Sequence, residues 1–159
     1  MPSAPKRSEG RFWPDGARLT FRADDGLEIV GEVRGQDDTA LIFLHGWCGD
    51  REYWKHQVEV FAADYRVVAL DQAGHGESGK GRRAWTADGL AADVEAVVKA
   101  LGLKRVILVG HSMGGSVALL AAKRMPVNCP RGVLRYHVRN SCSNCCDNSR
   151  NKNSRRPPR

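Results

Sequence analysis

The stretch from Arg105 to Met125 constrains the fold of this 159-residue chain more than any other. It opens with a short, β-branched apolar run, Val106–Val109, of the kind that forms a strand buried on both faces of a parallel sheet. It closes with an Ala- and Leu-rich run, Ser116–Met125, which contains no Gly or Pro and is stopped by Pro126. Such a run predicts a helix. The short connection between the two requires a sharp turn.

The connecting residues spell Gly-x-Ser-x-Gly, with Ser112 at the centre. On a strand-to-helix turn this pattern is typical of a nucleophile elbow, which strains the serine backbone and exposes its hydroxyl. Gly110 and Gly114 leave room for the turn, and Gly115 lets the helix approach the sheet. The N–H group of Met113 would then point toward a developing oxyanion. Because the pattern also occurs by chance, a structural Gly-rich turn is the alternative.

Composition divides the chain into a body and a tail. Residues 127–159 contain eight Lys or Arg and one acidic residue, and they account for the whole net charge of +7. They also hold every Asn and four of the five Cys, whereas apolar residues are scarce after Tyr136. We therefore predict a disordered segment at 1–17, a globular domain at 18–126, and a basic tail at 127–159. The tail is predicted to be disordered and not native to the fold, as after a frameshift or alternative splicing.

Strand and helix signals alternate along the body. Two runs with a period of two flank a turn signal at Asp24-Asp25-Gly26, which predicts an antiparallel hairpin. Later apolar runs predict buried parallel strands, and stretches with helical apolar spacing separate them. The predicted strands before the elbow are Arg18–Arg22, Leu27–Val33, Ala40–Leu44 and Arg66–Leu70, and the predicted helices are Tyr53–Ala63 and Thr86–Leu101. This order indicates an incomplete α/β fold, a hairpin plus three central parallel strands with helices on both faces.

The loop His45-Gly46-Trp47 follows the first central strand, at the edge where open α/β sheets bind ligands. If Ser112 forms an elbow, this loop faces it, and the N–H group of Trp47 becomes a second oxyanion donor while the indole lines an acyl pocket. A tight turn with the indole packed on the core is the alternative. His45 could act as a general base, but we favour a structural role, which is more common for a His at this position.

The loop after the second central strand, Asp71–Gly81, contains two partial nucleotide-binding patterns. Gly74, Gly76 and Gly79 have the spacing of a dinucleotide fingerprint, but no helix opens there and no second strand carries the required acid. The same residues approach a phosphate-loop pattern, yet Gly81 stands where a Ser or Thr must bind Mg²⁺. We therefore predict a structural loop and no bound cofactor.

Three motifs together carry a resemblance to a known family. They are Leu-His-Gly-Trp at 44–47, Asp-Gln-Ala-Gly-His-Gly-Glu-Ser at 71–78 and Gly-His-Ser-Met-Gly-Gly at 110–115. In this order and spacing they resemble the amino-terminal half of an α/β-hydrolase of the esterase, perhydrolase and carbon–carbon hydrolase branch. The resemblance covers about Leu19–Pro126 and implies a serine hydrolase that acts on an ester or similar carbonyl.

The resemblance implies a role for several single residues. Ser112 matches the nucleophile, and Trp47 and Met113 match the two donors of the oxyanion hole. Four neighbouring residues are expected to shape the site: His45, Gly46, Asp71 and His111. A Ser rather than an Asp nucleophile implies acyl transfer on a small ester-like substrate, not dehalogenase or epoxide-hydrolase chemistry.

The resemblance stops before the family's acid and His, which follow the elbow in the order Ser, Asp/Glu, His. After Pro126 the chain offers only His137 and then Asp147, in the reverse order and without a predicted strand to hold them. A serine without an adjacent base is a weak nucleophile, so we expect an inactive or severely impaired enzyme. The alternative is a non-catalytic product, a pseudo-enzyme or binding module. Without the next strand, Val106–Val109 is expected to be a bare sheet edge prone to self-association or aggregation.

The remaining features suggest few further partners. Cys residues and His137 in the tail lack a second pair of zinc ligands, so we predict no metal site. The basic residues of the tail favour a solvated segment over specific nucleic-acid binding, because aromatic residues are not interleaved with them. No secretory leader or membrane-spanning run is visible, which predicts no membrane partner. A single cysteine in the body, Cys48, favours the reducing cytoplasm.

Overall fold

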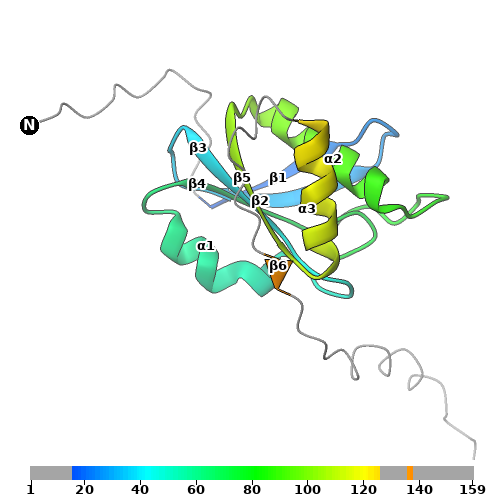
Figure 1. Cartoon of the computed structure of the whole chain (residues 1–159), viewed down its shortest axis with the longest axis horizontal. Coiled ribbons are helices and arrows are strands. Elements are labelled where there is room, and N and C mark those ends of the chain that lie inside the picture. Colours follow the sequence, from blue (N-terminus) through cyan, green and yellow to red (C-terminus); the bar gives the residue numbers. More distant parts are fainter. Residues whose placement is uncertain (1–15, 126–135, 138–159) are drawn as a thin grey trace, which may run out of the picture.

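The computed structural model describes residues 16–125 and 136–137, which form a sheet with helices on both faces (Figure 1). The strand order is β1-β2-β4-β3-β5-β6. The strands are β1 (Ala17–Arg22), β2 (Glu28–Arg34), β3 (Thr39–Leu44), β4 (Arg66–Leu70), β5 (Arg105–His111) and β6 (Tyr136–His137). The helices are the 3-10 helix η1 (Arg51–Trp54), α1 (Lys55–Phe61), α2 (Ala87–Leu101) and α3 (Met113–Arg124). Strands β3 to β6 run parallel, whereas β1 and β2 are antiparallel to their neighbours, so the predicted α/β class is confirmed.

Two apolar cores cover the two faces of the sheet. Helices α2 and α3 lie on one face and α1 lies on the other (Figure 1). Along β3, Ile42 and Leu44 belong to the core under α2 and α3, whereas Leu41 and Phe43 belong to the core under α1. A strand buried on both faces has no polar side, which explains the uninterrupted apolar sequence of β3.

The predicted hairpin is confirmed with its turn. Strand β1 pairs antiparallel with β2 over its full length, from Ala17 opposite Val33 to Arg22 opposite Glu28. The turn is closed by the N–H group of Gly26, which donates to the carbonyl oxygen of Ala23 at 2.8 Å. Gly26 adopts a φ of 84°, a value that a residue without Cβ accepts at no steric cost.

Helix α2 also begins and ends where its sequence predicts. The hydroxyl of Thr86 accepts the N–H of Gly89 at 3.0 Å, and Gly102 ends the helix in a left-handed conformation with φ 63°. The apolar residues at helical spacing are buried against the sheet; they are Leu90, Val94, Val97, Val98 and Leu101. Local caps and periodicity therefore suffice to place this helix.

The helix predicted at Tyr53–Ala63 differs from the structure. The chain first turns as η1 and only then continues as α1, which ends at Phe61. The carboxylate of Asp50 accepts the N–H of Glu52 at 3.0 Å, and this cap starts the turn earlier than the apolar spacing indicates. Trp54 is buried, whereas Phe61 remains 39% exposed.

Strand β5 corrects the prediction of a strand buried on both faces. Val106 and Leu108 are buried, but Ile107 and Val109 are only half-buried. The core under α1 is built from β3 and β4, so the side chains of β5 reach only its margin. The following helix α3 also starts earlier than predicted, at Met113 instead of Ser116.

Strand β6 corrects the prediction that the tail contains no strand. Tyr136 pairs with Gly110 and His137 pairs with His111, both in parallel with β5. The outer edge of β5 is therefore not bare at its carboxyl end, although no strand in the described ranges pairs with Arg105–Val109 on that side. Backbone groups make this pairing, so composition does not reveal it. Strand β1 starts at Ala17, within the predicted leading segment; the other residues predicted to be disordered lie outside the described ranges.

Candidate active site

Ser112 lies in the turn between β5 and α3 with φ 53° and ψ −117°. Few residues with a Cβ adopt such a conformation, which costs about 1–3 kcal/mol and is found mainly at functional sites. Ser112 also stands at the amino-terminal cap of α3, yet its side chain makes no capping hydrogen bond. Ser112 is half-buried, and its hydroxyl is not used to hold the helix.

The turn depends on two residues that lack side chains. A Cβ at Gly110 would lie 2.2 Å from the carbonyl oxygen of Gly114. A Cβ at Gly114 would lie 2.2 Å from the carbonyl oxygen of Leu44, at the end of β3. Both distances are far below van der Waals contact, and both obstacles are backbone atoms that cannot swing aside. The predicted need for small residues on both sides of Ser112 is confirmed.

The loop after β3 lies against this turn. A Cβ at Gly46 would lie 2.8 Å from Nδ1 of His111, and one at Gly114 would lie 2.5 Å from the carbonyl oxygen of His45. The structure thus brings His45 and Gly46 beside His111, the residue before Ser112. Four of the predicted site residues therefore meet at the carboxyl ends of β3 and β5: His45, Gly46, His111 and Ser112.

His45 is completely buried, and both of its ring nitrogens have hydrogen-bond partners. Nε2 accepts the backbone N–H of Gln72 at 3.0 Å, and Nδ1 lies 2.7 Å from the carbonyl oxygen of Gly46. Because Nε2 is an acceptor, the proton belongs on Nδ1, which donates to Gly46. Burial is the main cause that lowers the pKa of His45 below its ordinary value. A neutral imidazole with both nitrogens bonded supports the structural role.

Gln72 is a site residue that the sequence analysis did not single out. Its side-chain N–H donates to the carbonyl oxygen of His45 at 2.6 Å, and the residue is buried. Together with the bond from its backbone N–H, Gln72 ties the loop after β4 to the loop after β3 at two points. In the sequence, Gln72 was marked only by being a polar residue just after the apolar run of β4.

Asp71 is buried and anchors two segments of chain. Its Oδ1 accepts the backbone N–H of Arg51 at 2.7 Å, and its Oδ2 accepts the backbone N–H of Glu77 at 2.9 Å. The guanidinium of Arg51 pairs with the same carboxylate and also reaches Glu77. Hydrogen bonds from Arg51 and then Arg18 hold the pKa of Glu77 below its ordinary value. Asp71 is therefore placed to shape the site by holding loops, and its oxygens are already occupied.

The Gly-rich loop after β4 uses its N–H groups internally. The N–H of Gly74 donates to the carbonyl oxygen of Gly79 at 2.9 Å, and the N–H of Gly79 donates to the carbonyl oxygen of Glu28 at 2.8 Å. The hydroxyl of Ser78 is buried and accepts the N–H of Val30 at 2.8 Å. A phosphate cradle needs N–H groups that point to the ligand, so this geometry supports a structural loop.

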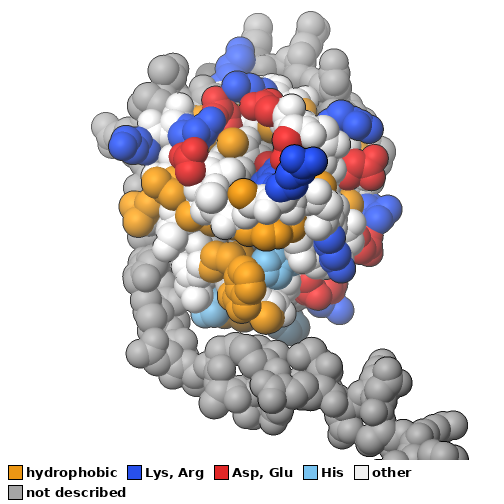
Figure 2. All heavy atoms as spheres, turned by 90° about the vertical axis from the view of Figure 1, so that its right-hand side faces the viewer, with side chains coloured by type: hydrophobic (Ala, Val, Ile, Leu, Met, Phe, Trp, Pro, Cys, Tyr) orange, Lys and Arg blue, Asp and Glu red, His pale blue; other side chains and the backbone are white. Residues whose placement is uncertain are grey.

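Aromatic rings gather around the loops at this edge of the sheet. The indole of Trp47 is 63% exposed and meets His75 edge-on, with 5.2 Å between the ring centroids. His111 stacks on Tyr53 with 4.8 Å between the centroids. Figure 2, which views the right-hand side of Figure 1, shows hydrophobic side chains beside histidines at the surface. The predicted contact of the Trp47 indole with an acyl group stays a prediction.

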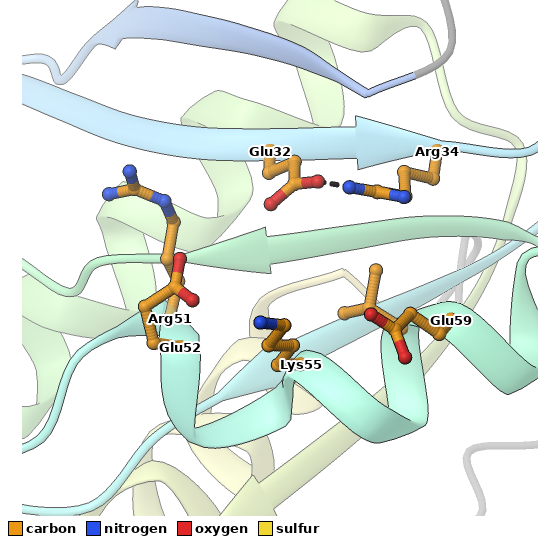
Figure 3. A pocket seen from close by; sticks show the side chains of 7 residues that line it. Glu32, Arg34, Arg51, Glu52, Lys55 and Glu59 are labelled. Atoms are coloured by element: carbon orange, nitrogen blue, oxygen red, sulfur yellow. Dashed lines mark hydrogen bonds and ion pairs between the residues drawn. The ribbon is translucent and has the colours of Figure 1, made fainter.

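A charged cleft of about 100 Å³ lies between β2 and α1 (Figure 3). Its lining residues are Glu32, Arg34, Arg51, Glu52, Lys55, Val58 and Glu59. Arg34 pairs with Glu32 inside the cleft, and Arg51 extends to Asp71 at the loops of the site. Acidic and basic side chains are equal in number, so the cleft has no excess charge that would select an ionic ligand.

The described residues contain no cluster suited to a metal ion. Across 16–125 and 136–137, no three His, Cys, Asp or Glu side chains lie close enough together to hold one. Cys48 is exposed and forms no disulfide. No helix in these ranges combines the length and apolar character needed to cross a bilayer. The predicted absence of a zinc site in the tail concerns residues outside the described ranges.

Curated proteins similar to this chain have several activities. A dihydrolipoyllysine-residue acetyltransferase component of the acetoin cleaving system from Pseudomonas putida is 40% identical over 95 residues, which cover 60% of this chain and 26% of that protein. Epoxide hydrolase 4 from Mus musculus is 36% identical over 106 residues, which cover 65% of this chain and 30% of that protein. The chain thus spans about a third or less of the length of these two relatives.

Comparisons of structure and of family patterns agree with each other. A solved structure described as "Est816 as an N-Acyl homoserine lactone degrading enzyme" superposes with a TM-score of 0.66 and 30% identity, over 70% of this chain and 42% of that chain. The family model for the alpha/beta hydrolase fold matches residues 39–148, from β3 into the segment after Pro126. Because this match covers more than half of the sequence, the chain belongs to the α/β-hydrolase fold family.

Proposed function

We propose that Ser112 is the nucleophile of a hydrolase that forms an acyl-enzyme with an ester or similar carbonyl substrate. The observation that carries this proposal is the positive φ of Ser112, in a turn that only small residues at 110 and 114 allow. An ordinary Gly-rich connection would place the strained conformation on a glycine, where it costs little. The description of Est816 as a lactone-degrading enzyme is consistent with this chemistry, since a lactone is a cyclic ester.

Two backbone N–H groups are suited to bind the oxyanion of the tetrahedral intermediate. Met113 is the first residue of α3, so its N–H has no intrahelical acceptor and lies at the positive end of the helix dipole. Trp47 follows Gly46, which lies directly against His111. Loss of one such donor typically costs about 2.7–4 kcal/mol of transition-state stabilisation.

The proposed reaction proceeds in two balanced halves. First, Oγ of Ser112 bonds to the carbonyl carbon while its proton passes to a base, and the carbonyl oxygen becomes the oxyanion. The bond from carbon to the alcohol oxygen then breaks, and the alcohol leaves with a proton. Water attacks the acyl-serine in the same way, which releases the acid and restores the hydroxyl.

Acyl transfer is favoured over epoxide opening despite the similarity to epoxide hydrolase 4. Epoxide-hydrolase chemistry of this fold uses an Asp nucleophile at the elbow, whereas this chain has Ser112 there. A serine alkoxide adds to carbonyl carbon and leaves again on hydrolysis, which suits an ester.

We further propose that turnover by this chain is slow. His45 and Asp71 lie near the turn, but their hydrogen bonds hold loops in place. An oxyanion hole and binding without a complete triad leave about 10³–10⁴-fold acceleration over water. A non-catalytic product is the second candidate, because the hydrogen bonds of His45 and Asp71 already hold loops in place.

Labelling with a fluorophosphonate probe tests the proposal. We expect the folded wild-type chain to be labelled, and Ser112→Ala to lose the label. Ser116→Ala is the matched control, because Ser116 is an exposed residue one turn farther along α3. Its labelling should equal that of the wild type. A folded wild-type chain without label, or equal label on Ser112→Ala, would make the proposal wrong and favour the non-catalytic product.

A further inference from the structure

The imidazole of His111 contacts two other segments of the chain at once. The first is the loop after β3: a Cβ built at Gly46 would lie 2.8 Å from Nδ1 of His111 and 3.3 Å from its Cε1. The Cα of Gly46 therefore lies within about 4.3 Å of Nδ1, which is van der Waals contact. The second is η1, whose Tyr53 stacks on the imidazole with 4.8 Å between the ring centroids and 22° between the ring planes.

The ring of Tyr53 is in turn held by the core under α1. It meets the indole of Trp54 almost at a right angle, with 4.9 Å between the centroids. Trp54 is buried and packs on Phe43 of β3, with 5.0 Å between the centroids. Offset-stacked and edge-to-face contacts are the arrangements that aromatic rings prefer. A row of rings therefore runs from the core to His111 and limits the positions that the imidazole can take.

The two contacts of His111 join the segments that carry the proposed oxyanion donors. Trp47 directly follows Gly46, and Met113 follows His111 by two residues. Both N–H groups must lie about 2.7–3.1 Å from the same oxygen, so the separation of the two segments has to be fixed. A misplacement of about 1 Å can cost about 100-fold in rate.

The lack of a side chain at Gly46 agrees with this arrangement. Gly46 is not among the glycines with a positive φ, so its backbone conformation is open to other residues. The two atoms nearest to a Cβ at this position belong to the imidazole of His111, and the next, at 3.4 Å, is the carbonyl oxygen of His111. The imidazole therefore occupies the space that a side chain at position 46 would need.

We propose that His111 is a positioning residue that sets the separation of the two oxyanion donors by packing against Gly46 and Tyr53. This inference rests on the proposed function, in which Trp47 and Met113 supply the donors. The width of the imidazole keeps the loop after β3 at one distance from the turn of Ser112. The stack on Tyr53 keeps the imidazole from rotating out of this place.

The rate of fluorophosphonate labelling of Ser112 in the full chain tests this inference. As Oγ bonds to phosphorus and fluoride leaves, the phosphoryl oxygen gains negative charge and needs the same two donors. His111→Ala should lower the maximal labelling rate by about 10–100-fold, less than the loss of a whole donor, and leave the half-saturating probe concentration unchanged. His111→Phe keeps a flat ring and should retain most of the rate. His56→Ala is the matched control, exposed on α1, and should label at the wild-type rate.

A double-mutant cycle with Gly46→Ala tests the contact itself. In the wild-type background Gly46→Ala should slow labelling by about 10-fold, because the added methyl group displaces the imidazole. In the His111→Ala background the same change should alter the rate by less than about twofold, whereas independent sites would give equal factors. Tyr53→Ala should also slow labelling, and Tyr53→Phe, which keeps the stacked ring, should not.

The outcomes separate this inference from the proposed function. A folded wild type that takes no label overturns the proposed function and the inference with it. A wild-type rate in His111→Ala, equal factors for Gly46→Ala in both backgrounds, or a His111→Phe as slow as His111→Ala overturns the inference and leaves Ser112 as the nucleophile. Fewer labelled molecules at an unchanged rate attribute the loss to unfolding and also overturn it. If His111→Ala does not fold, equal rates for Tyr53→Ala and Tyr53→Phe overturn it.

Discussion

Single atoms decide the geometry around Ser112. The hydrogen atoms of Gly110 and Gly114 stand where any other residue would place a Cβ against a carbonyl oxygen. Helix α3 can approach the end of β3 closely because Gly110 and Gly114 have no Cβ. With both ends of the turn held in this way, Ser112 keeps a φ of 53° that it would not adopt in a free chain.

Gly114→Ala should destabilise the fold although alanine is the better helix former. Alanine gains about 1 kcal/mol of helix propensity over glycine. Its Cβ would lie 2.2 Å from the carbonyl oxygen of Leu44, and overpacking against atoms that cannot move costs about 1–3 kcal/mol or more. We expect a net loss of about 2 kcal/mol in the free energy of unfolding, measured in urea.

Gly81→Ala is the control for this substitution. No atom lies within 4 Å of a Cβ built at Gly81, so the free energy of unfolding should change by less than about 0.5 kcal/mol. Equal midpoints for Gly114→Ala and wild type would contradict the clash.

At the scale of elements, two buried polar connections hold the loops at the carboxyl edge of the sheet. Gln72 bonds His45 and so joins the loop after β4 to the loop after β3. Asp71 bonds Arg51 and so joins the end of β4 to the start of η1. These connections arrange the loop that carries Trp47, and neither of them reaches Ser112 directly.

Arg51→Met tests the second connection. The substitution keeps an apolar stem but leaves the buried carboxylate of Asp71 without its cationic partner. Removing one partner of a buried ion pair costs about 3–5 kcal/mol. We expect the lower end of this range, because two backbone N–H groups still bond Asp71. The measurement is the urea midpoint of unfolding.

Arg22→Met is its matched control on the surface. Arg22 pairs with Glu28 at 3.7 Å, and both side chains are largely exposed. Exposed pairs contribute about 0–1 kcal/mol, so the midpoint should hardly move. Similar losses for both variants would show that burial does not set the contribution of Arg51.

At the scale of the whole molecule, the sheet ends in β1 on one side and in β5 with the two-residue strand β6 on the other. Strand β1 of the hairpin forms one edge, and at the other edge, in the described ranges, β6 pairs only with the last two residues of β5. The N–H and C=O groups along Arg105–Val109 are therefore a template for another strand. The half-buried side chains of Ile107 and Val109 extend this open edge.

We expect the chain to self-associate through this edge as its concentration rises. Ile107→Lys should weaken association, because a charge on an edge strand opposes pairing with another strand. Leu119→Lys is the control, since Leu119 is 53% exposed and lies on helix α3 instead of the edge strand. Sedimentation velocity over a concentration series measures the effect. A monomer at every concentration, or equal effects of both lysines, would contradict association through the edge.

Local patterns were enough for most of the fold. The β1–β2 hairpin, the buried strands β3 and β4 and the capped helix α2 follow from period, turn residues and caps within a few positions of each other. The same holds for the turn at Ser112, because the strand, the two glycines and the helix that define it are consecutive in the chain.

The sequence by itself thus determined the α/β class, the position of Ser112 and the motifs that meet around it. Only the tertiary structure decided the bonds of Gln72 to His45 and of Arg51 to Asp71, the half-exposed face of β5, and the pairing of His137 beside the nucleophile turn. The physical reason is how far apart in the sequence the interacting groups stand. Periodicity and caps act between near neighbours, whereas these contacts join groups twenty or more positions apart, through backbone and polar atoms that leave no periodic trace in the sequence.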